Sequence, residues 1–133
     1  MTKIIALVFA AALISTPALA QQPPAPLASA PIKRIPLQKL DVPGTNMEAI
    51  TGIAEIAPNV NIGRHSHFGV ESGYVLEGEF TMLVDGQPPR PMKAGDSYSI
   101  PTGVVHDVHS NTSVRVIATY VVEKGEPLAT PAQ

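Results

Sequence analysis

The chain contains no cysteine and no tryptophan, and aromatic residues make up only 5% of it. Without cysteine the protein can form no disulfide, and it has no thiolate to offer a metal. Stability must therefore come from a packed core, a metal site or association between subunits. The scarcity of aromatic side chains also leaves no stacking platform of the kind that binds single-stranded nucleic acid.

Charge is scarce as well. Charged residues make up 15% of the chain, and the formal net charge is -2. Lysine and arginine do not gather into a basic patch, so we expect no nucleic-acid partner. The length of 133 residues suits one domain.

The N-terminus has the pattern of an export signal. Lys3 precedes an unbroken apolar run from Ile4 to Ile14, and small residues at Ala18 and Ala20 permit cleavage after Ala20. The run is shorter than the roughly 20 residues that a membrane-spanning helix needs, which favours a cleaved signal over an uncleaved anchor. We therefore predict a signal peptide at 1–20 and a periplasmic or secreted protein that has no membrane contact after cleavage.

Proline marks the borders of the predicted folded unit. Residues 21–36 contain five prolines with mostly small residues between them, which predicts an extended linker. Residues 125–133 include Pro127 and Pro131 and are predicted to be a flexible tail. Residues 37–124 then form a single folded domain.

Short apolar segments separated by glycine and proline turns predict an all-β domain. Strands are expected at Glu48–Ala57, Tyr74–Leu76, Phe80–Val84, Val104–His109 and Val114–Val122. A turn is expected around Gly78, and Asp85-Gly86 is a strong hairpin signal.

The segment 48–57 permits two interpretations. Ile50, Ile53 and Ile56 are spaced by three, as on a helix face. Gly52 inside the segment and Pro58 after it favour a bulged strand instead.

Histidines at alternating positions suggest a metal site. In a strand, residues i and i+2 project from the same face, so His65 and His67 would direct their rings at one point. Glu71 has the same parity, and a slight bend after Gly69 would bring its carboxylate there. Two imidazoles and a carboxylate form a ligand set for several transition metals. Alone, such a histidine pair is more often a solvated surface feature.

A second cluster places a third histidine after a turn rich in glycine and proline, and the two clusters together resemble the cupin family. The first motif of that family is Gly, five residues, His-x-His, three or four residues, Glu, six residues, Gly. His65, His67, Glu71 and Gly78 match it. The second motif is Gly, five residues, Pro-x-Gly, two residues, His, three residues, Asn. Gly95, Pro101, Gly103 and His106 match it.

Two positions depart from these motifs. The leading glycine of the first motif falls at Asn59, and asparagine is the residue that best replaces glycine at positive φ. The closing asparagine of the second motif falls at Ser110. Neither position is a metal ligand in the family pattern, so the departures concern turns.

The resemblance implies a double-stranded β-helix, a small jelly-roll barrel, with one divalent transition metal inside (Fe, Mn, Ni, Cu or Zn). It implies His65, His67, Glu71 and His106 as the ligands. The alternative is an empty or vestigial site, as some cupins have. His109 lies three residues beyond His106, has the opposite parity and is expected to face outward.

The resemblance also implies a function. A three-histidine, one-carboxylate site leaves positions open, so the metal can act as a Lewis acid or activate oxygen. We expect a metal-dependent enzyme for a small organic molecule, a dioxygenase ahead of a decarboxylase, lyase or isomerase. Glu71 is the candidate catalytic residue, because a ligating carboxylate can detach and accept a proton. The rival is a non-catalytic module that binds or senses a metal or small ligand.

Two further expectations concern the pocket and the assembly. Phe68, Tyr74, Met82 and Tyr98 are candidates for the pocket lining, although ordinary barrel core is the more frequent role of such side chains. Cupins commonly pair, so the resemblance implies a homodimer.

Overall fold

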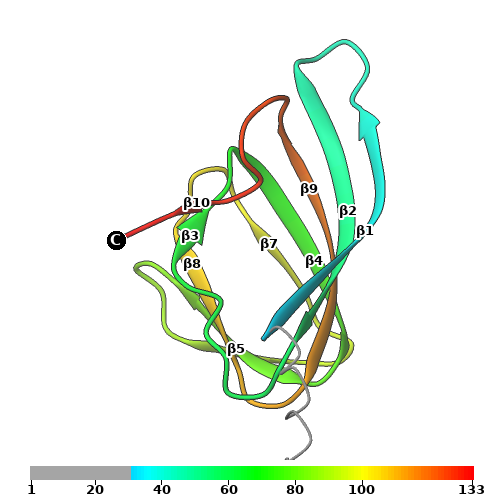
Figure 1. Cartoon of the computed structure of the whole chain (residues 1–133). Helices are drawn as coiled ribbons and strands as arrows, with labels where there is room; N and C mark the ends of the chain where they lie inside the picture. Colours follow the sequence, from blue (N-terminus) through cyan, green and yellow to red (C-terminus); the bar gives the residue numbers. More distant parts are fainter. Residues whose placement is uncertain (1–30) are drawn as a thin grey trace, which may run out of the picture.

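The computed structural model describes residues 31–133, and every element in that range is a β-strand (Figure 1). The predicted signal peptide and most of the predicted linker lie outside the described residues. The strands are β1 (Ile32–Asp41), β2 (Met47–Ile56), β3 (His65–Ser66), β4 (Gly69–Glu77), β5 (Glu79–Val84), β6 (Arg90–Lys93), β7 (Ser97–Ile100), β8 (His106–Ser110), β9 (Val114–Glu123) and β10 (Thr130–Pro131).

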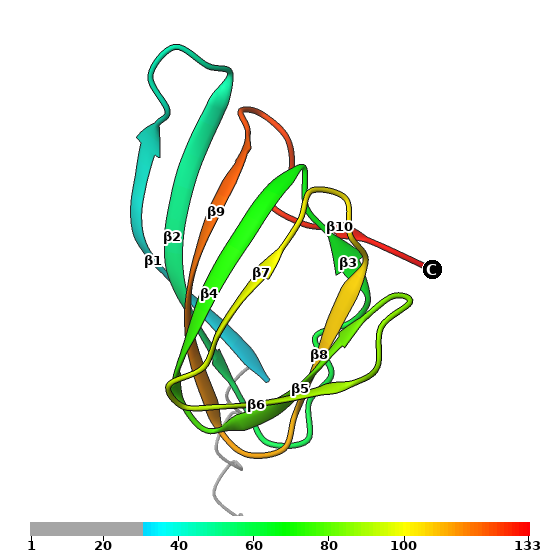
Figure 2. The same ribbon diagram turned by 180° about the vertical axis from the view of Figure 1, so that it is seen from behind.

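The strands form two five-stranded antiparallel sheets that face each other around a barrel interior (Figures 1 and 2). One sheet has the order β1-β2-β9-β4-β7, and the other has the order β10-β3-β8-β5-β6. This arrangement confirms the all-β jelly-roll prediction. Between residues 31 and 133, no helix has the length and hydrophobicity to cross a membrane.

The first hairpin resolves the ambiguity of segment 48–57. β2 is a strand, paired along its length with β1 and β9. The bulge predicted near Gly52 lies in the neighbouring strand, where the register of β1 shifts between Pro36 and Gln38. β1 begins at Ile32, so the predicted linker boundary at 36 falls inside a strand. Pro36 is tolerated there because β1 is an edge strand and needs no donor on its free side.

The predicted turn at Gly78 and the predicted hairpin at Asp85-Gly86 are confirmed. β4 and β5 are joined at Gly78, and β5 pairs with β6 across the turn that contains Asp85 and Gly86. Gly78 has a φ of 83°, and a Cβ at this position would lie 2.0 Å from the Ser113 carbonyl oxygen. Only glycine meets both requirements.

The two departures from the family motifs meet in space. Asn59 has a φ of 58°, as expected for a residue that replaces glycine in a turn. Its N–H donates to the Ser110 carbonyl at 2.9 Å. The buried Ser110 hydroxyl accepts from Val60 N–H at 2.9 Å and donates to the Ala57 carbonyl at 2.6 Å. Ser110 therefore ties the turn at 58–60 to the end of β8.

The C-terminal segment is paired rather than free. β10 pairs with β3, with Thr130 opposite Ser66 and Pro131 opposite His65. The Ala132 N–H donates to the Arg64 carbonyl at 2.9 Å. The prediction of a flexible tail at 125–133 missed this pairing, because a two-residue edge strand containing proline carries almost no strand signal in the sequence.

Along the strands, apolar side chains face one part of the barrel interior and polar side chains face the other. On β4, the inward positions run from the buried Val75 through Gly73 to Glu71. On β9, they run from Val116 through Ala118 to Tyr120. Val75 and Val116 belong to the apolar core, whereas Glu71 and Tyr120 lie side by side in the register toward the other end. The core therefore fills one end of the barrel and leaves the other for a polar site.

Candidate metal centre

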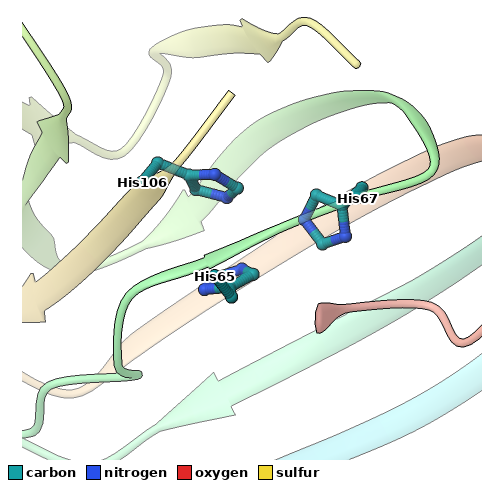
Figure 3. Close-up of side chains that lie close together, drawn as sticks. All are labelled: His65, His67 and His106. Atoms are coloured by element: carbon teal, nitrogen blue, oxygen red, sulfur yellow. The ribbon is translucent and has the colours of Figure 1, made fainter. Parts of the chain in front are cut away.

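Three histidine rings converge inside the barrel (Figure 3). His65 in β3 and His106 at the start of β8 are directly opposite in the strand register, and His67 follows two residues after His65. The ring centroids lie 4.2 Å apart for His65 and His106, 5.0 Å for His65 and His67, and 5.2 Å for His67 and His106. One nitrogen from each ring lies within 4.8 Å of the other two.

Each ring is oriented through its other nitrogen by a backbone carbonyl. Nδ1 of His65 donates to the Gly63 carbonyl at 2.7 Å, and Nδ1 of His106 donates to the Val104 carbonyl at 3.1 Å. Nδ1 of His67 donates to the Leu128 carbonyl at 2.5 Å. Because a carbonyl can only accept, all three protons are assigned to Nδ1, and the lone pair of each neutral ring is on Nε2. Metal-ligating histidines are held in this way.

Glu71 lies against two of the three rings. Its Oε2 is 3.0 Å from His67 Nε2 and 3.3 Å from His106 Nε2. Its Oε1 accepts a hydrogen bond of 2.8 Å from the Tyr98 hydroxyl. The four predicted ligands thus lie together at one place. The group with mutually close nitrogens consists of the three histidines, so the role of Glu71 as a fourth ligand remains a prediction.

Gly73 explains how Tyr98 reaches Glu71. The two residues face each other between β4 and β7. A Cβ on Gly73 would lie 2.2 Å from the Tyr98 ring, so the ring occupies the space that any other side chain at 73 would need. Glycine in this strand therefore lets the phenol lie across β4 and place its hydroxyl on the carboxylate.

Burial and close contacts shift the pKa values of three side chains in the site. Burial raises the pKa of Glu71, but contacts with His106, His67 and Tyr98 outweigh it and lower the pKa to about 2. Burial lowers the pKa of His106, yet the Glu71 carboxylate and the Val104 carbonyl raise it above its usual value. Burial also dominates at His65 and lowers its pKa. The carboxylate is thus ionised at neutral pH, and His106 holds a proton more readily than His65 does.

The residues fit a divalent transition metal. His67 Nε2 is buried and makes no hydrogen bond, although Glu71 Oε2 lies 3.0 Å away. A buried nitrogen without a partner is costly unless something binds it. Three imidazoles beside a carboxylate, with no sulfur, suit zinc, copper, iron, nickel and manganese. With the barrel fold, this donor set indicates a metal site.

A cavity of about 180 Å³ leads to the histidines. Of the four residues predicted as lining candidates, Tyr98 and Met82 are buried and line it. Phe68 and Tyr74 do not, since they are 40% and 46% exposed on the outside of the barrel. Strand alternation explains the difference, because Tyr74 follows the inward-facing Gly73 on β4. His109 also lies outside the site, where its Nδ1 contacts Asn61 Oδ1 at 2.6 Å.

Three features of the site were not identified from the sequence. The Tyr120 ring lies 5.0 Å from the His67 ring, and Arg34 and Leu128 line the cavity. Burial and the Glu71 charge raise the pKa of Tyr120, while the Arg34 charge acts in the opposite direction. Alternation along 114–122 could have placed Tyr120 inside, with Val116 and Ala118. No sequence signal marks a backbone carbonyl such as that of Leu128.

Comparisons with curated proteins found a local relationship. A stretch of 53 residues is 45% identical to the HTH-type transcriptional regulator PuuR of Escherichia coli (strain K12), and equally to that of Shigella flexneri. It covers 40% of this chain but only 28% of each regulator, so the chain spans about a quarter of the length of these relatives.

Solved structures share the fold at low sequence identity. A cupin superfamily protein from Desulfitobacterium hafniense DCB-2 matches with a TM-score of 0.61 and 14% identity, over 69% of this chain and 78% of that one. The DMSP lyase DddQ from Ruegeria pomeroyi DSS-3 gives 0.57 and 20%, over 63% and 43%. A salicylate 1,2-dioxygenase from Pseudaminobacter salicylatoxidans gives 0.52 and 14%, over 54% and 20%.

The family assignment rests on sequence and structure together. The family model described as "Cupin domain" matches residues 52–123, which is more than half of the chain and includes all four predicted ligands. The resemblance inferred from the two motifs is thereby confirmed, and the strand order agrees with it. The chain belongs to the cupin family.

Proposed function

We propose that this protein is a metal-dependent cupin enzyme that acts on a small organic molecule, with dioxygenase chemistry as the leading reaction type. The observation that carries the proposal is the convergence of three histidines whose Nδ1 atoms are all engaged by backbone carbonyls. Their Nε2 atoms are thereby left for a metal, at the end of a cavity that a small molecule can enter.

Each group around the centre has a role in this proposal. His65, His67 and His106 hold the ion, which supplies Lewis acidity or, if redox-active, oxygen chemistry. Tyr98 holds the carboxylate of Glu71 in place through its 2.8 Å hydrogen bond. The apolar cavity walls, including Met82 and Ile56, exclude water around the substrate.

Glu71 is the proposed proton acceptor. Its pKa of about 2 keeps the carboxylate ionised at neutral pH, and it borders the cavity. The Tyr98 hydroxyl binds Oε1 only, so Oε2 faces the histidines and can accept a proton from a molecule bound beside them.

Substitution of one ligand tests the metal site. His106→Ala is expected to lose most of the bound metal, because it removes the ring opposite His65. His109→Ala is the matched control, since His109 contacts Asn61 outside the site and should leave metal content unchanged. Metal per chain is measured by elemental analysis after purification. Full occupancy in His106→Ala would refute the ligand assignment.

The identity of the metal follows from the ligands. Without sulfur, affinity should follow the general order in which copper and zinc exceed iron and manganese. We therefore expect zinc or copper in protein recovered from an extracytoplasmic compartment. Stoichiometric iron or manganese in such a preparation would contradict this expectation.

Dioxygen consumption tests the reaction type. The Fe(II)-loaded protein is incubated with a panel of catechols, flavonols and diketones, and oxygen uptake is recorded with an electrode. Uptake above that of His106→Ala treated with the same amount of Fe(II) is expected with at least one compound. Absence of uptake with every compound would remove the dioxygenase reaction and leave lyase, decarboxylase or isomerase chemistry.

A second candidate is a non-catalytic module that binds or senses a small ligand. The local identity to the transcriptional regulator PuuR favours it. A sensing module would bind its ligand reversibly and return it unchanged. Recovery of an intact ligand after prolonged incubation with the metal-loaded protein, together with a ligand-dependent rise in melting temperature, would support this candidate over an enzyme.

Export is part of the same proposal. The pattern of residues 1–20 supports cleavage after Ala20 and folding outside the cytoplasm. N-terminal sequencing of protein from a periplasmic fraction should begin at Gln21. Retention of Met1 in protein confined to the cytoplasm would contradict export.

A further inference from the structure

Arg34 occupies an unusual position on the edge strand β1. In the antiparallel register it lies opposite Ala54, which lies opposite the buried Val116 of β9. Residues directly opposite in such a register project from the same face of the sheet. Arg34 therefore projects from the face that lines the barrel interior, and its exposed side chain lines the cavity near Tyr120.

The charge of Arg34 is unbalanced at this place. Across residues 31–133, no carboxylate lies within 4.0 Å of its guanidinium, and it is the one lysine or arginine that lines the cavity. Its neighbour Lys33 differs in both respects, since it projects from the opposite face and pairs with Glu55 at 3.4 Å. The walls of the cavity are mainly apolar, including Ile50, Ala54 and Ile56.

We propose that Arg34 selects substrates that carry a carboxylate, which it binds at the cavity mouth while the rest of the molecule extends toward His65, His67 and His106. The proposal rests on the proposed function, in which this cavity receives the substrate. A guanidinium matches a carboxylate with two parallel hydrogen bonds. One arginine balances one negative charge, and Glu71 farther inside disfavours a second one.

The size of the cavity sets the scale of the organic acid. Its volume of about 180 Å³ slightly exceeds the roughly 150 Å³ of an engineered apolar cavity that binds benzene. A single ring, or a chain of similar size, fits beside the apolar walls. Benzoate and benzamide are therefore suitable probes, because they share a ring and differ in charge.

The test compares these two probes on the full chain, with and without Zn²⁺, by NMR titration. Wild-type protein is expected to bind benzoate at least about tenfold more tightly than benzamide, as for a hydrogen-bonded charge pair. Arg34→Gln should abolish the preference, and Arg34→Lys should retain only part of it. Lys33→Gln, which removes the same charge one residue away, should leave the preference intact.

Equal binding of the two probes by wild-type protein would overturn the proposal, and so would a preference that survives in Arg34→Gln. Elemental analysis of the same samples separates this inference from the metal proposal. Normal zinc content without a carboxylate preference would refute the role of Arg34 alone. If the protein holds no zinc but still prefers benzoate through Arg34, the metal site is refuted and the role of Arg34 stands.

Discussion

At the scale of single residues, the centre depends on groups that hold the ligands as much as on the ligands. Tyr98 is the clearest case, because its ring lies over Gly73 and its hydroxyl donates to Glu71. Burial and the neighbouring Glu71 charge raise the pKa of Tyr98, so the hydroxyl keeps its proton and remains a donor. The carboxylate therefore has a fixed position before any substrate arrives.

Removal of this hydroxyl tests its contribution. Tyr98→Phe leaves a buried oxygen of Glu71 without its donor, which should lower the free energy of unfolding by about 1–3 kcal/mol. Tyr74→Phe removes the same atom from a side chain that is 46% exposed, and should change stability by less than about 0.5 kcal/mol. Denaturant unfolding of the metal-free proteins measures both. Equal effects would show that the hydrogen bond to Glu71 does not stabilise the fold.

The histidines make the stability of metal-free protein depend on pH. The pKa of His106 is raised above its usual 6.5 in the fold, mainly by Glu71 acting against burial, so its stabilising effect is present below pH 6.5 and is lost as pH rises through the folded-state pKa. The pKa of His65 is lowered by burial, so stability is lost as pH falls from 6.5 through its folded-state pKa. Glu71 stays ionised throughout this range.

The expected result is a melting temperature that is highest near pH 6.5 and falls on both sides. Chelator-treated protein is measured by differential scanning calorimetry from pH 5 to 9. His106→Gln should remove the decline on the alkaline side, and His65→Gln should remove the decline on the acid side. A wild-type profile that rises steadily through pH 8 would contradict the assignment of a stabilising His106–Glu71 pair.

At the scale of elements, the C-terminal segment acts as a support for the centre. β10 is short, but its pairing with β3 holds the preceding residues at the cavity, where the Leu128 carbonyl accepts a hydrogen bond from Nδ1 of His67. His67 lies in the segment between β3 and β4, so it has less support from its own strand than His65 or His106. The orientation of this ring therefore depends on a segment more than 60 residues away in sequence.

Deletion of residues 128–133 is expected to weaken Zn²⁺ binding by about 10–100-fold, the usual effect of losing the partner of a ligating histidine. Competition with a fluorescent chelator measures the affinity. Removal of Gln133 alone is the control and should have no effect. Ala132→Pro removes the donor to the Arg64 carbonyl and should cause a smaller loss in a chain of nearly full length. Undiminished affinity after the deletion would show that Leu128 does not orient His67.

At the scale of the whole molecule, the outer face of the β1-β2-β9-β4-β7 sheet exposes apolar side chains. Val70 and Tyr74 on β4 are 47% and 46% exposed, and their register partners Val121 and Ile117 on β9 extend the surface. Exposed apolar surface of this kind often marks a contact between subunits. The homodimer expected from the family remains a prediction, and this face is a candidate for the contact between its subunits.

Sedimentation velocity at several concentrations tests the prediction. Wild-type protein should sediment with twice the mass of one chain, because an isologous contact uses the same face on both subunits. Val70→Lys together with Tyr74→Lys should shift the species to a monomer. Thr81→Lys on β5 of the other sheet is a control for added charge. A wild-type protein that is monomeric at all concentrations would contradict the prediction.

The metal-site residues could be predicted largely from local spacing. His65 and His67 share a strand face because of the two-residue period, and the glycine and proline spacing around His106 identified the second motif. The turn at Asn59 was also predictable, because few residues other than glycine adopt its positive φ. These features depend on neighbours in sequence.

The remaining features depend on pairings between distant segments, which leave little trace in local composition. The start of β1 at Ile32 and the pairing of β10 are both set by partner strands, and proline content indicated the opposite for each. The Leu128 carbonyl is a backbone atom, and Arg34 faces the cavity only because of the register of β1 against β2. The sequence by itself determined the family and the four candidate ligands, because those follow from short-range spacing. Tertiary structure alone decided which backbone carbonyls orient the histidines and which charged side chain of β1 lines the cavity, because strand register brings distant residues together.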